Sequence, residues 1–196
     1  MRGEEGAFPF AKYKINQVNE RDYMKHKSII IAGMAILLSV SAPAATSVVI
    51  AVGTNQYSAL VGGPAVTTTR QLTIAQGEVL TWHYHPGSVF TVVKQGTLTV
   101  EDGCGGVEVY ATGQAFEEEF FRVHHGMNLG TNDVVTIQTF VVPLGFPTTV
   151  QTPNNQPLCG APISVEECKN GGWMKFNYPR TFKSQGDAEQ YVITGK

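Results

Sequence analysis

Short β-rich runs separated by glycine-containing turns dominate the chain between Ser58 and Pro143. Residue types that favour extended strands fill each run, and no run shows an apolar period suited to a helix. Strands of about five residues joined by tight turns are typical of a β-sandwich or β-barrel, so the sequence predicts an all-β fold. The runs span residues 66–74, 79–84, 89–94, 97–101, 107–110 and 134–142.

Composition and charge narrow the class of protein further. The chain has 196 residues, 42% of them apolar, and a formal net charge of −2. This length and apolar content suit one ordinary domain with a single core. Because no segment clusters Lys and Arg with interleaved aromatic residues, the sequence argues against a nucleic-acid partner.

The amino-terminal residues have the pattern of an export signal. Basic side chains precede an apolar run at residues 29–40, and Ala42-Pro43-Ala44 supplies the small residues that signal peptidase requires. We interpret residues 24–44 as a signal peptide and residues 1–23 as a non-structural extension. The protein would then be exported, either periplasmic or secreted, with no stable membrane partner after cleavage. The alternative is a membrane anchor formed by an uncleaved segment 28–44.

The composition changes after the β-rich region. Residues 147–158 are rich in Pro, Thr, Asn and Gln, so they are predicted to form a linker rather than a strand. The predicted organisation is a β-barrel over residues 45–146, this linker, and a small carboxyl-terminal segment over residues 159–196.

Histidines carry the clearest chemical signal. His83 and His85 lie two residues apart in a predicted strand, so both imidazoles point to one face of the sheet. Two ring nitrogens on one face can reach a single ion at about 2.1 Å. His124 comes from a later strand, and a barrel that places the two segments side by side would complete the site. Strand alternation points His125 to the opposite face, which favours a surface or supporting role.

The spacing of these residues resembles that of a cupin. Residues 77–96 follow the first cupin motif, with a glycine, five residues, His-x-His, three residues, a position that is usually acidic, six residues and a second glycine. Residues 113–128 match the second motif in spacing, with Gly113, His124 and Asn128 at its fixed positions. The resemblance implies a jelly-roll barrel, the double-stranded β-helix typical of cupins.

The resemblance also implies a metal site. Its donors would be the neutral nitrogens of His83, His85 and His124. The family's usual glutamate ligand falls on Val89, which has no donor atom, so water would complete the coordination shell. Imidazole donors suit a divalent transition metal ion, namely Zn, Fe, Ni, Cu or Mn, better than Mg or Ca. The alternative is a barrel that has kept its shape and lost its ion.

Side chains in phase with the histidine pair are the candidates for the wall of a ligand pocket. These residues are Val79, Thr81, Val89, Thr91 and Val93. Because this wall is mainly apolar, we expect a small organic ligand, such as an organic acid or a phenolic compound, rather than a sugar or phosphate.

An acidic run at residues 117–119 offers a replacement carboxylate or a general base near the ion. Strand alternation places Glu117 and Glu119 on one face and Glu118 on the other. Glu119 is the candidate catalytic residue.

The side chains of Leu80, Trp82 and Tyr84 face away from the histidines. Three large apolar groups in a row need a cover. The cover would come from a partner chain in a homodimer, which is the preferred interpretation, or from the chain's own segment 47–60.

Three cysteines leave one thiol without a partner. In an oxidising compartment, a disulfide between Cys104 and Cys159 would fasten the end of the linker to the barrel, with Cys159 to Cys168 as the alternative pairing. The tail resembles a short segment at the carboxyl end of various exported bacterial proteins, in which a second cysteine follows a Gly-Asp pair. Ala188 occupies that place here, so Cys168 is expected to be a free thiol.

Two classes of function fit these features. One is a metal-dependent enzyme, such as an oxygenase, isomerase or decarboxylase, whose substrate enters open positions on the metal. The other is a non-catalytic binding protein of the same fold, with or without metal. The fold does not decide between them, because cupins host both.

Overall fold

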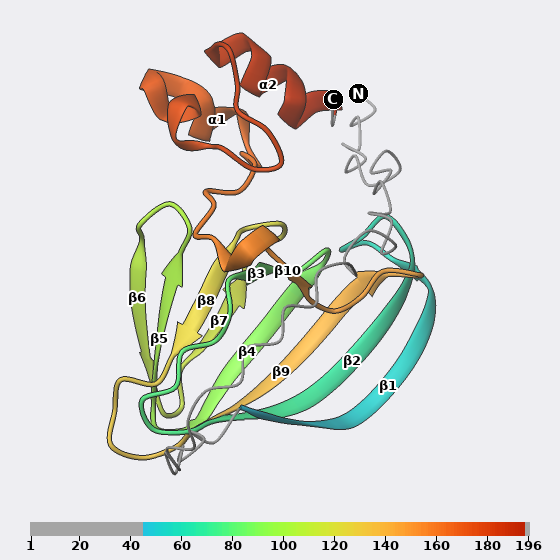
Figure 1. The fold of residues 1–196 in the computed structure, drawn as a ribbon. Helices are drawn as coiled ribbons and strands as arrows, with labels where there is room; N and C mark the ends of the chain where they lie inside the picture. The colour runs from blue at the N-terminus through green and yellow to red at the C-terminus, as the bar shows by residue number, and fades with distance from the viewer. Residues whose placement is uncertain (1–44, 195–196) are drawn as a thin grey trace, which may run out of the picture.

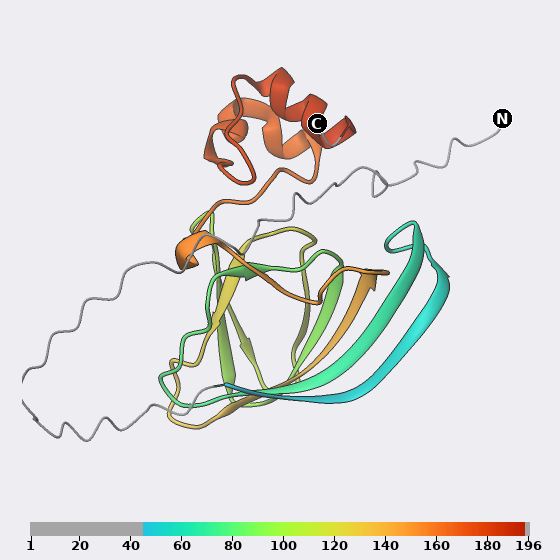
Figure 2. The same ribbon diagram turned by 45° about the vertical axis from the view of Figure 1, so that its right-hand side comes forward.

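The computed structural model describes residues 45–194, so the predicted signal peptide and extension lie outside the described residues. Two five-stranded antiparallel sheets form the walls of an open barrel, with short helices above one end (Figures 1 and 2). The all-β jelly-roll prediction is confirmed. The first sheet has the order β1 (Thr46–Ser58), β2 (Gly63–Ile74), β9 (Val134–Pro143), β4 (Ser88–Gln95) and β7 (Ala115–Glu118). The second has the order β10 (Val150–Gln151), β3 (His83–Tyr84), β8 (His124–Met127), β5 (Thr97–Asp102) and β6 (Val107–Ala111).

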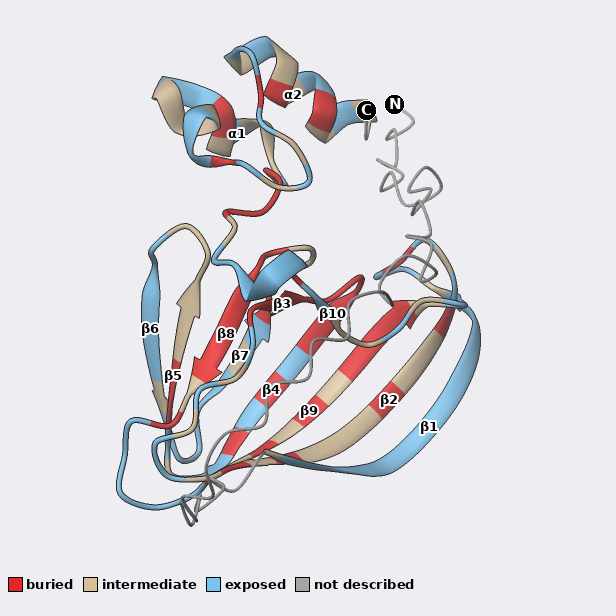
Figure 3. Cartoon of the chain, in the orientation of Figure 1, coloured by how far each residue is buried: buried red, intermediate tan, exposed pale blue. Residues whose placement is uncertain are grey.

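Alternation along the central strands builds the interior of the barrel. In β4 the side chains of Val89, Thr91 and Val93 are fully buried, whereas Phe90 and Val92 point outward and are partly exposed. Strand β9 alternates in the same way and buries polar Thr136 and Gln138 between apolar residues (Figure 3). Buried polar groups need partners, so this part of the interior is built to hold polar chemistry.

The outer face of β3 is covered by the chain itself. Trp82 and Tyr84 are buried, and they pack with Val123 against partly buried side chains of Val150 and Leu158. The segment 47–60 does not supply this cover, because β1 is an edge strand exposed along almost its whole length (Figure 3). The apolar face that favoured a homodimer is therefore already covered within one chain.

Residues 147–158, predicted to be a linker, contain strand β10 and a short 3-10 turn at Pro153–Asn155. Strand β10 pairs with β3, so that Val150 lies opposite Tyr84. The backbone N–H of Trp82 also donates a hydrogen bond of 2.6 Å to Asn155 Oδ1. The sequence hid this strand because a pairing of two residues is too short to show an alternating pattern.

The carboxyl-terminal segment forms a small helical unit with its own core. It contains α1 (Val165–Cys168), the 3-10 segment η4 (Lys169–Lys175) and α2 (Gln185–Thr194). A capping box of Ser164 and Glu167 begins α1. Its core consists of Cys159, Ala161, Cys168, Phe176, Phe182, Ala188 and Tyr191. In the part of the chain that the structure describes, no helix has the length and hydropathy of a membrane span.

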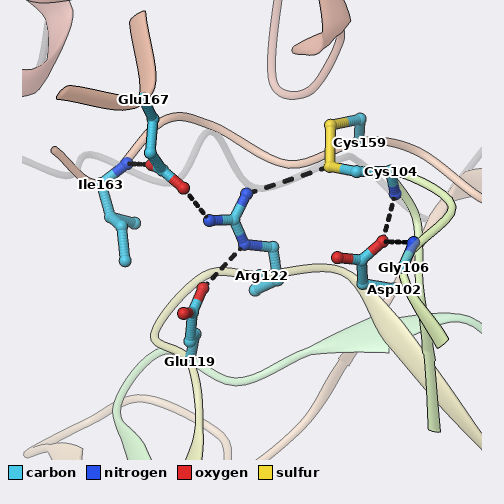
Figure 4. Close-up of a disulfide and its surroundings, with 8 residues drawn as sticks. All are labelled: Asp102, Cys104, Gly106, Glu119, Arg122, Cys159, Ile163 and Glu167. Carbon is cyan, nitrogen blue, oxygen red and sulfur yellow. Dashed lines mark hydrogen bonds and ion pairs between the residues drawn. A yellow bond between two sulfur atoms is a disulfide. The ribbon is translucent and has the colours of Figure 1, made fainter. Parts of the chain in front are cut away.

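A disulfide between Cys104 and Cys159 joins this unit to the turn between β5 and β6 (Figure 4). This is the pairing that the sequence analysis favoured. The two chain segments lie very close together, since a Cβ atom on Gly103 would be only 1.9 Å from the Leu158 carbonyl oxygen. Beside the disulfide, the Arg122 guanidinium pairs with Glu119 of the barrel and Glu167 of the helical unit.

Cys168 is a free thiol, as expected, and it is fully buried. Burial raises the pKa of the Cys168 thiol, which keeps it protonated. Ala188 is fully buried in the same core. We expect Ala188→Cys to form a disulfide with Cys168 and to raise the free energy of unfolding by about 3 kcal/mol through loop closure. Denaturant unfolding without reductant, compared with that of the unmodified protein, measures this gain, because reductant would also open the Cys104–Cys159 disulfide.

The control variant is Ala188→Cys combined with Cys168→Ser, which has the new thiol but no partner for it. Without reductant it should be no more stable than the unmodified protein. Thiol titration of Ala188→Cys in denaturant without reductant should find no free cysteine. Two titratable thiols would contradict the prediction.

Candidate metal centre

Three histidines converge inside the barrel, as the sequence spacing predicted. His83 of β3 lies directly opposite His124 of β8 in the sheet register, and His85 follows β3. All three side chains are buried. One ring nitrogen from each residue lies within 4.8 Å of the others. The arrangement therefore offers three nitrogen donors to one ion.

A backbone carbonyl fixes the orientation of each of these imidazoles. The Nδ1 atom of His83 lies 2.6 Å from the carbonyl oxygen of Thr81. The Nδ1 atom of His85 lies 2.6 Å from that of Thr148, and the Nδ1 atom of His124 lies 2.9 Å from that of Arg122. A carbonyl oxygen only accepts hydrogen bonds, so each Nδ1 carries the proton and donates it. Each Nε2 is then turned away from its carbonyl, which is how histidine ligands are oriented in metal sites. In the described part of the chain, the Nε2 lone pairs of His83 and His85 are free, whereas His124 Nε2 must give up the hydrogen bond that it donates to Glu118 before it binds an ion.

His85 provides a direct test of whether a metal ion fits. Its Nε2 atom is buried and makes no hydrogen bond within residues 45–194, although Glu118 Oε2 lies only 2.8 Å away. An unsatisfied buried nitrogen is costly, and the contact with the carboxylate lacks the geometry of a hydrogen bond. A cation shared by the two atoms would satisfy both, so the residues present fit a metal ion.

The electrostatics of the site keep one histidine neutral and one carboxylate charged. Burial, with the neighbouring His124 and His85, lowers the pKa of His83 to about 3. Burial alone would raise the pKa of Glu118, but its hydrogen bond to His124 holds that pKa well below the ordinary value. Burial would lower the pKa of His124, and the same hydrogen bond raises it. His83 therefore needs no deprotonation before it binds a metal at neutral pH.

The acidic residue beside the histidines is Glu118, which corrects the prediction of Glu119. The Glu118 carboxylate is buried, and Oε2 lies 3.2 Å from His124 Nε2. The Glu119 carboxylate is 56% exposed and pairs with Arg122 Nε at 2.9 Å. The alternation of side chains along a strand correctly predicted that these two residues lie on opposite faces, but the sequence could not show which face points into the barrel. Glu118 ends β7 opposite Val89 of β4, and this pairing directs its side chain inward.

His125 lies outside the histidine cluster, as alternation predicted. Its ring stacks on Trp82 with centroids 3.8 Å apart, and Nε2 lies 3.1 Å from Glu101 Oε2. The side chain is buried, so it supports the packing of β3 and is not a surface residue.

Among the described residues, cavities reach two of the three histidines, His83 and His124. The smaller, of about 20 Å³, lies in the barrel and is lined by His83, Glu118 and His124 together with polar Thr136 and Gln138 and apolar side chains. The larger, of about 520 Å³, is a cleft that reaches His124 and Glu118. The helical unit contributes Glu167 and Lys175 to its wall. A small organic molecule could therefore approach the site through this cleft.

Neither cavity is lined by the five residues that were predicted to form the pocket wall. Strand β3 contains only His83 and Tyr84, so the alternation assumed for Val79 and Thr81 does not extend that far and both side chains are exposed. The other predicted residues, Val89, Thr91 and Val93, are fully buried in the interior of the barrel.

Most of the charged side chains that line the cleft are acidic. The basic side chains in the lining are Arg122 and Lys175. Arg122 is already paired with Glu119 and Glu167. The Tyr110 and Phe116 rings also line the cleft and stack on each other with centroids 3.8 Å apart. The acidic lining residues are Asp102, Glu108, Glu117, Glu118, Glu119 and Glu167.

Sequence reasoning named Thr91 only as part of a pocket wall, and it did not identify Gln138, the other residue that holds Glu118. Thr91 Oγ1 donates a hydrogen bond of 2.6 Å to Glu118 Oε1, and Gln138 Nε2 donates one of 3.1 Å to the same oxygen. One signal was available, since Thr136 and Gln138 interrupt an otherwise apolar inward face of β9 between Val134 and Phe140. Polar residues at buried positions of a strand indicate a site.

Several known proteins are similar to this chain in sequence or fold. The Cupin domain family matches residues 70–141, and no curated protein matches the chain. An uncharacterised protein from Klebsiella pneumoniae with a double-stranded β-helix domain is 18% identical, with a TM-score of 0.44, over 56% of this chain and 85% of that one. A cupin-like protein from Thermotoga maritima is 17% identical, with a TM-score of 0.41, over 44% and 64% of the two chains. An oxalate oxidase is 18% identical, with a TM-score of 0.35, over 40% and 46%.

Proposed function

Residues 70–141 of this chain are a cupin domain, and from that premise we propose that the protein is a metal-dependent enzyme acting on a small organic molecule. The ion would be held by His83, His85 and His124, and the substrate would enter through the 520 Å³ cleft. When bound, a divalent transition metal would supply Lewis-acid or redox chemistry.

The observation that carries this proposal is the common orientation of the three imidazoles. Each Nδ1 is engaged by a backbone carbonyl, so the three Nε2 atoms are left to meet in one buried place as ligands for one ion. A barrel that had lost its ion would have no need to keep all three rings in this orientation. The open cleft beside His124 favours turnover, because an ion that served only to stabilise the fold would need no route for a substrate.

The lining of the cleft narrows the class of ligand. Carboxylates such as Glu108 and Glu117 outnumber the cations, and the Tyr110 and Phe116 rings present an aromatic surface. Like charges repel, so an organic acid would bind less readily than a neutral or cationic molecule. Of the two ligand classes expected from the sequence, a phenolic compound fits this cleft better than an organic acid.

Export to an oxidising compartment is part of this proposal. The disulfide between Cys104 and Cys159 supports it, because such bonds persist mainly in proteins that leave the reducing cytoplasm. Mass spectrometry of the protein from its own cells should find a mature chain that begins near Ala45.

The experiment that tests the function has two stages. Metal-free protein is first dialysed separately against Mn, Fe(II), Ni, Cu and Zn, and we expect one ion per chain. The loaded protein is then incubated with matched pairs of a phenol and its carboxylated analogue, with metal-free protein as the control. We expect conversion of the phenol by the loaded form. Metal binding without any conversion would favour the non-catalytic binding protein, and no metal binding would overturn the proposal.

A further inference from the structure

The position where the chain lacks an acidic ligand lies opposite a buried acid on the neighbouring strand. Val89 of β4 pairs with Glu118 of β7 in the antiparallel register. We propose that Glu118 is a fourth metal ligand, and that it supplies across the sheet the carboxylate that Val89 does not. This inference rests on the proposed function, since it assigns one more residue to the same ion.

The distances around Glu118 suit a shared ion. Oε2 lies 2.8 Å from His85 Nε2 and 3.2 Å from His124 Nε2. Two donors at right angles around an ion, each about 2.1 Å from it, are about 3.0 Å apart. A single carboxylate oxygen therefore stands at ligand spacing from two histidine nitrogens at once. His85 Nε2 makes no hydrogen bond to it, so the contact is not explained as an ordinary hydrogen bond.

The other carboxylate oxygen is held away from the histidines. Oε1 accepts hydrogen bonds from Thr91 Oγ1 at 2.6 Å and Gln138 Nε2 at 3.1 Å. Gln138 is fixed in turn, because its Oε1 accepts a hydrogen bond of 2.9 Å from Arg70 Nε. Outer partners of this kind orient metal-binding carboxylates. They leave Oε2 directed toward the histidines, so Glu118 is arranged to bind through one oxygen.

A charged ligand changes the properties of the site. Three imidazoles would leave the full charge of the ion in a buried place, whereas Glu118 neutralises part of it. The carboxylate also occupies a position that would otherwise be open to substrate or water. Thr91 and Gln138 are positioning residues in this account, because they reach the ion only through Glu118.

The acidic run offers matched controls for a test. Glu117 and Glu119 flank Glu118, and both side chains are exposed. We compare Glu118→Gln with Glu117→Gln and Glu119→Gln by measuring metal affinity in competition with a chromophoric chelator. The expected loss is at least tenfold for Glu118→Gln, by analogy with the roughly 10–100-fold losses seen for supporting residues. The two control variants should stay within about twofold of the unmodified protein.

A second variant addresses the possibility that Glu118→Gln disturbs folding. Val89→Glu combined with Glu118→Val moves the acid across the same strand pair. We expect it to bind metal more tightly than Glu118→Gln. The visible absorption of bound Co(II) should also differ between the unmodified protein and Glu118→Gln, because the donor set changes.

The outcomes separate this inference from the proposed function. If the unmodified protein binds one ion and Glu118→Gln matches it in both affinity and Co(II) absorption, the ion is held by histidines alone and this inference is overturned. If the unmodified protein binds no ion, the proposed function fails and this inference fails with it.

Discussion

Replacing His85 with alanine is expected to lower metal affinity by more than about 100-fold. Changes to outer partners of metal ligands already cost about 10–100-fold, and loss of a ligand should cost more. His85 is fully buried, and its Nε2 atom has no hydrogen bond that could make it serve another role. The same competition assay measures the change.

His125→Ala is the matched control. His125 is the residue next to His124, and its replacement also removes a buried imidazole. That ring stacks on Trp82 and contacts Glu101. We expect the metal affinity of this variant to stay within about threefold of the unmodified protein, although its stability falls. Equal losses of affinity in the two variants would show that His85 acts through packing alone.

Gly87→Ala is expected to cost about 3 kcal/mol of unfolding free energy, the upper end for overpacked interiors. A Cβ atom at Gly87 would lie 2.1 Å from the Val141 oxygen and 2.8 Å from Val142 Cα. Both are backbone atoms of β9, the central strand of the first sheet, so neither can move aside as a flexible side chain would. Because His85 is only two residues away, a shift of this loop should also weaken metal binding.

Denaturant unfolding of the metal-free protein measures this effect, with Gly53→Ala as the control. Gly53 lies in exposed β1, where an added Cβ atom would meet nothing within 4 Å. Its replacement should change stability by less than about 0.5 kcal/mol. Similar values for the two variants would mean that the close packing of Gly87 on β9 does not limit stability.

The barrel and the histidine cluster could be predicted from sequence because their signals are local. Alternating strands and turn residues indicate a jelly roll, and His83 and His85 share a face because side chains in a strand repeat every two residues. The cover of Trp82 could not be predicted in this way. It depends on β10 and on Leu158, which are brought to β3 by a pairing of only two residues.

The placement of Glu118 shows a second limit of local pattern. Alternation separates Glu118 from its neighbours but does not say which face is inside, and that choice depends on the pairing of β7 with β4. The cleft is harder still to predict, since it combines residues of β5, β6 and β7 with Glu167 and Lys175 of the helical unit. The acidic run at residues 117–119 was expected to offer a replacement for the acid missing at Val89, but the sequence could not show that Glu118 is the cross-strand neighbour of Val89.

The most direct test is a crystal structure of the protein soaked with Mn or Zn, with anomalous diffraction recorded at the absorption edge of the metal. The account predicts one strong anomalous peak about 2.1 Å from the Nε2 atoms of His83, His85 and His124, with Glu118 Oε2 at a similar distance. No peak at the histidines, or a peak held by the exposed carboxylates of the cleft, would contradict it.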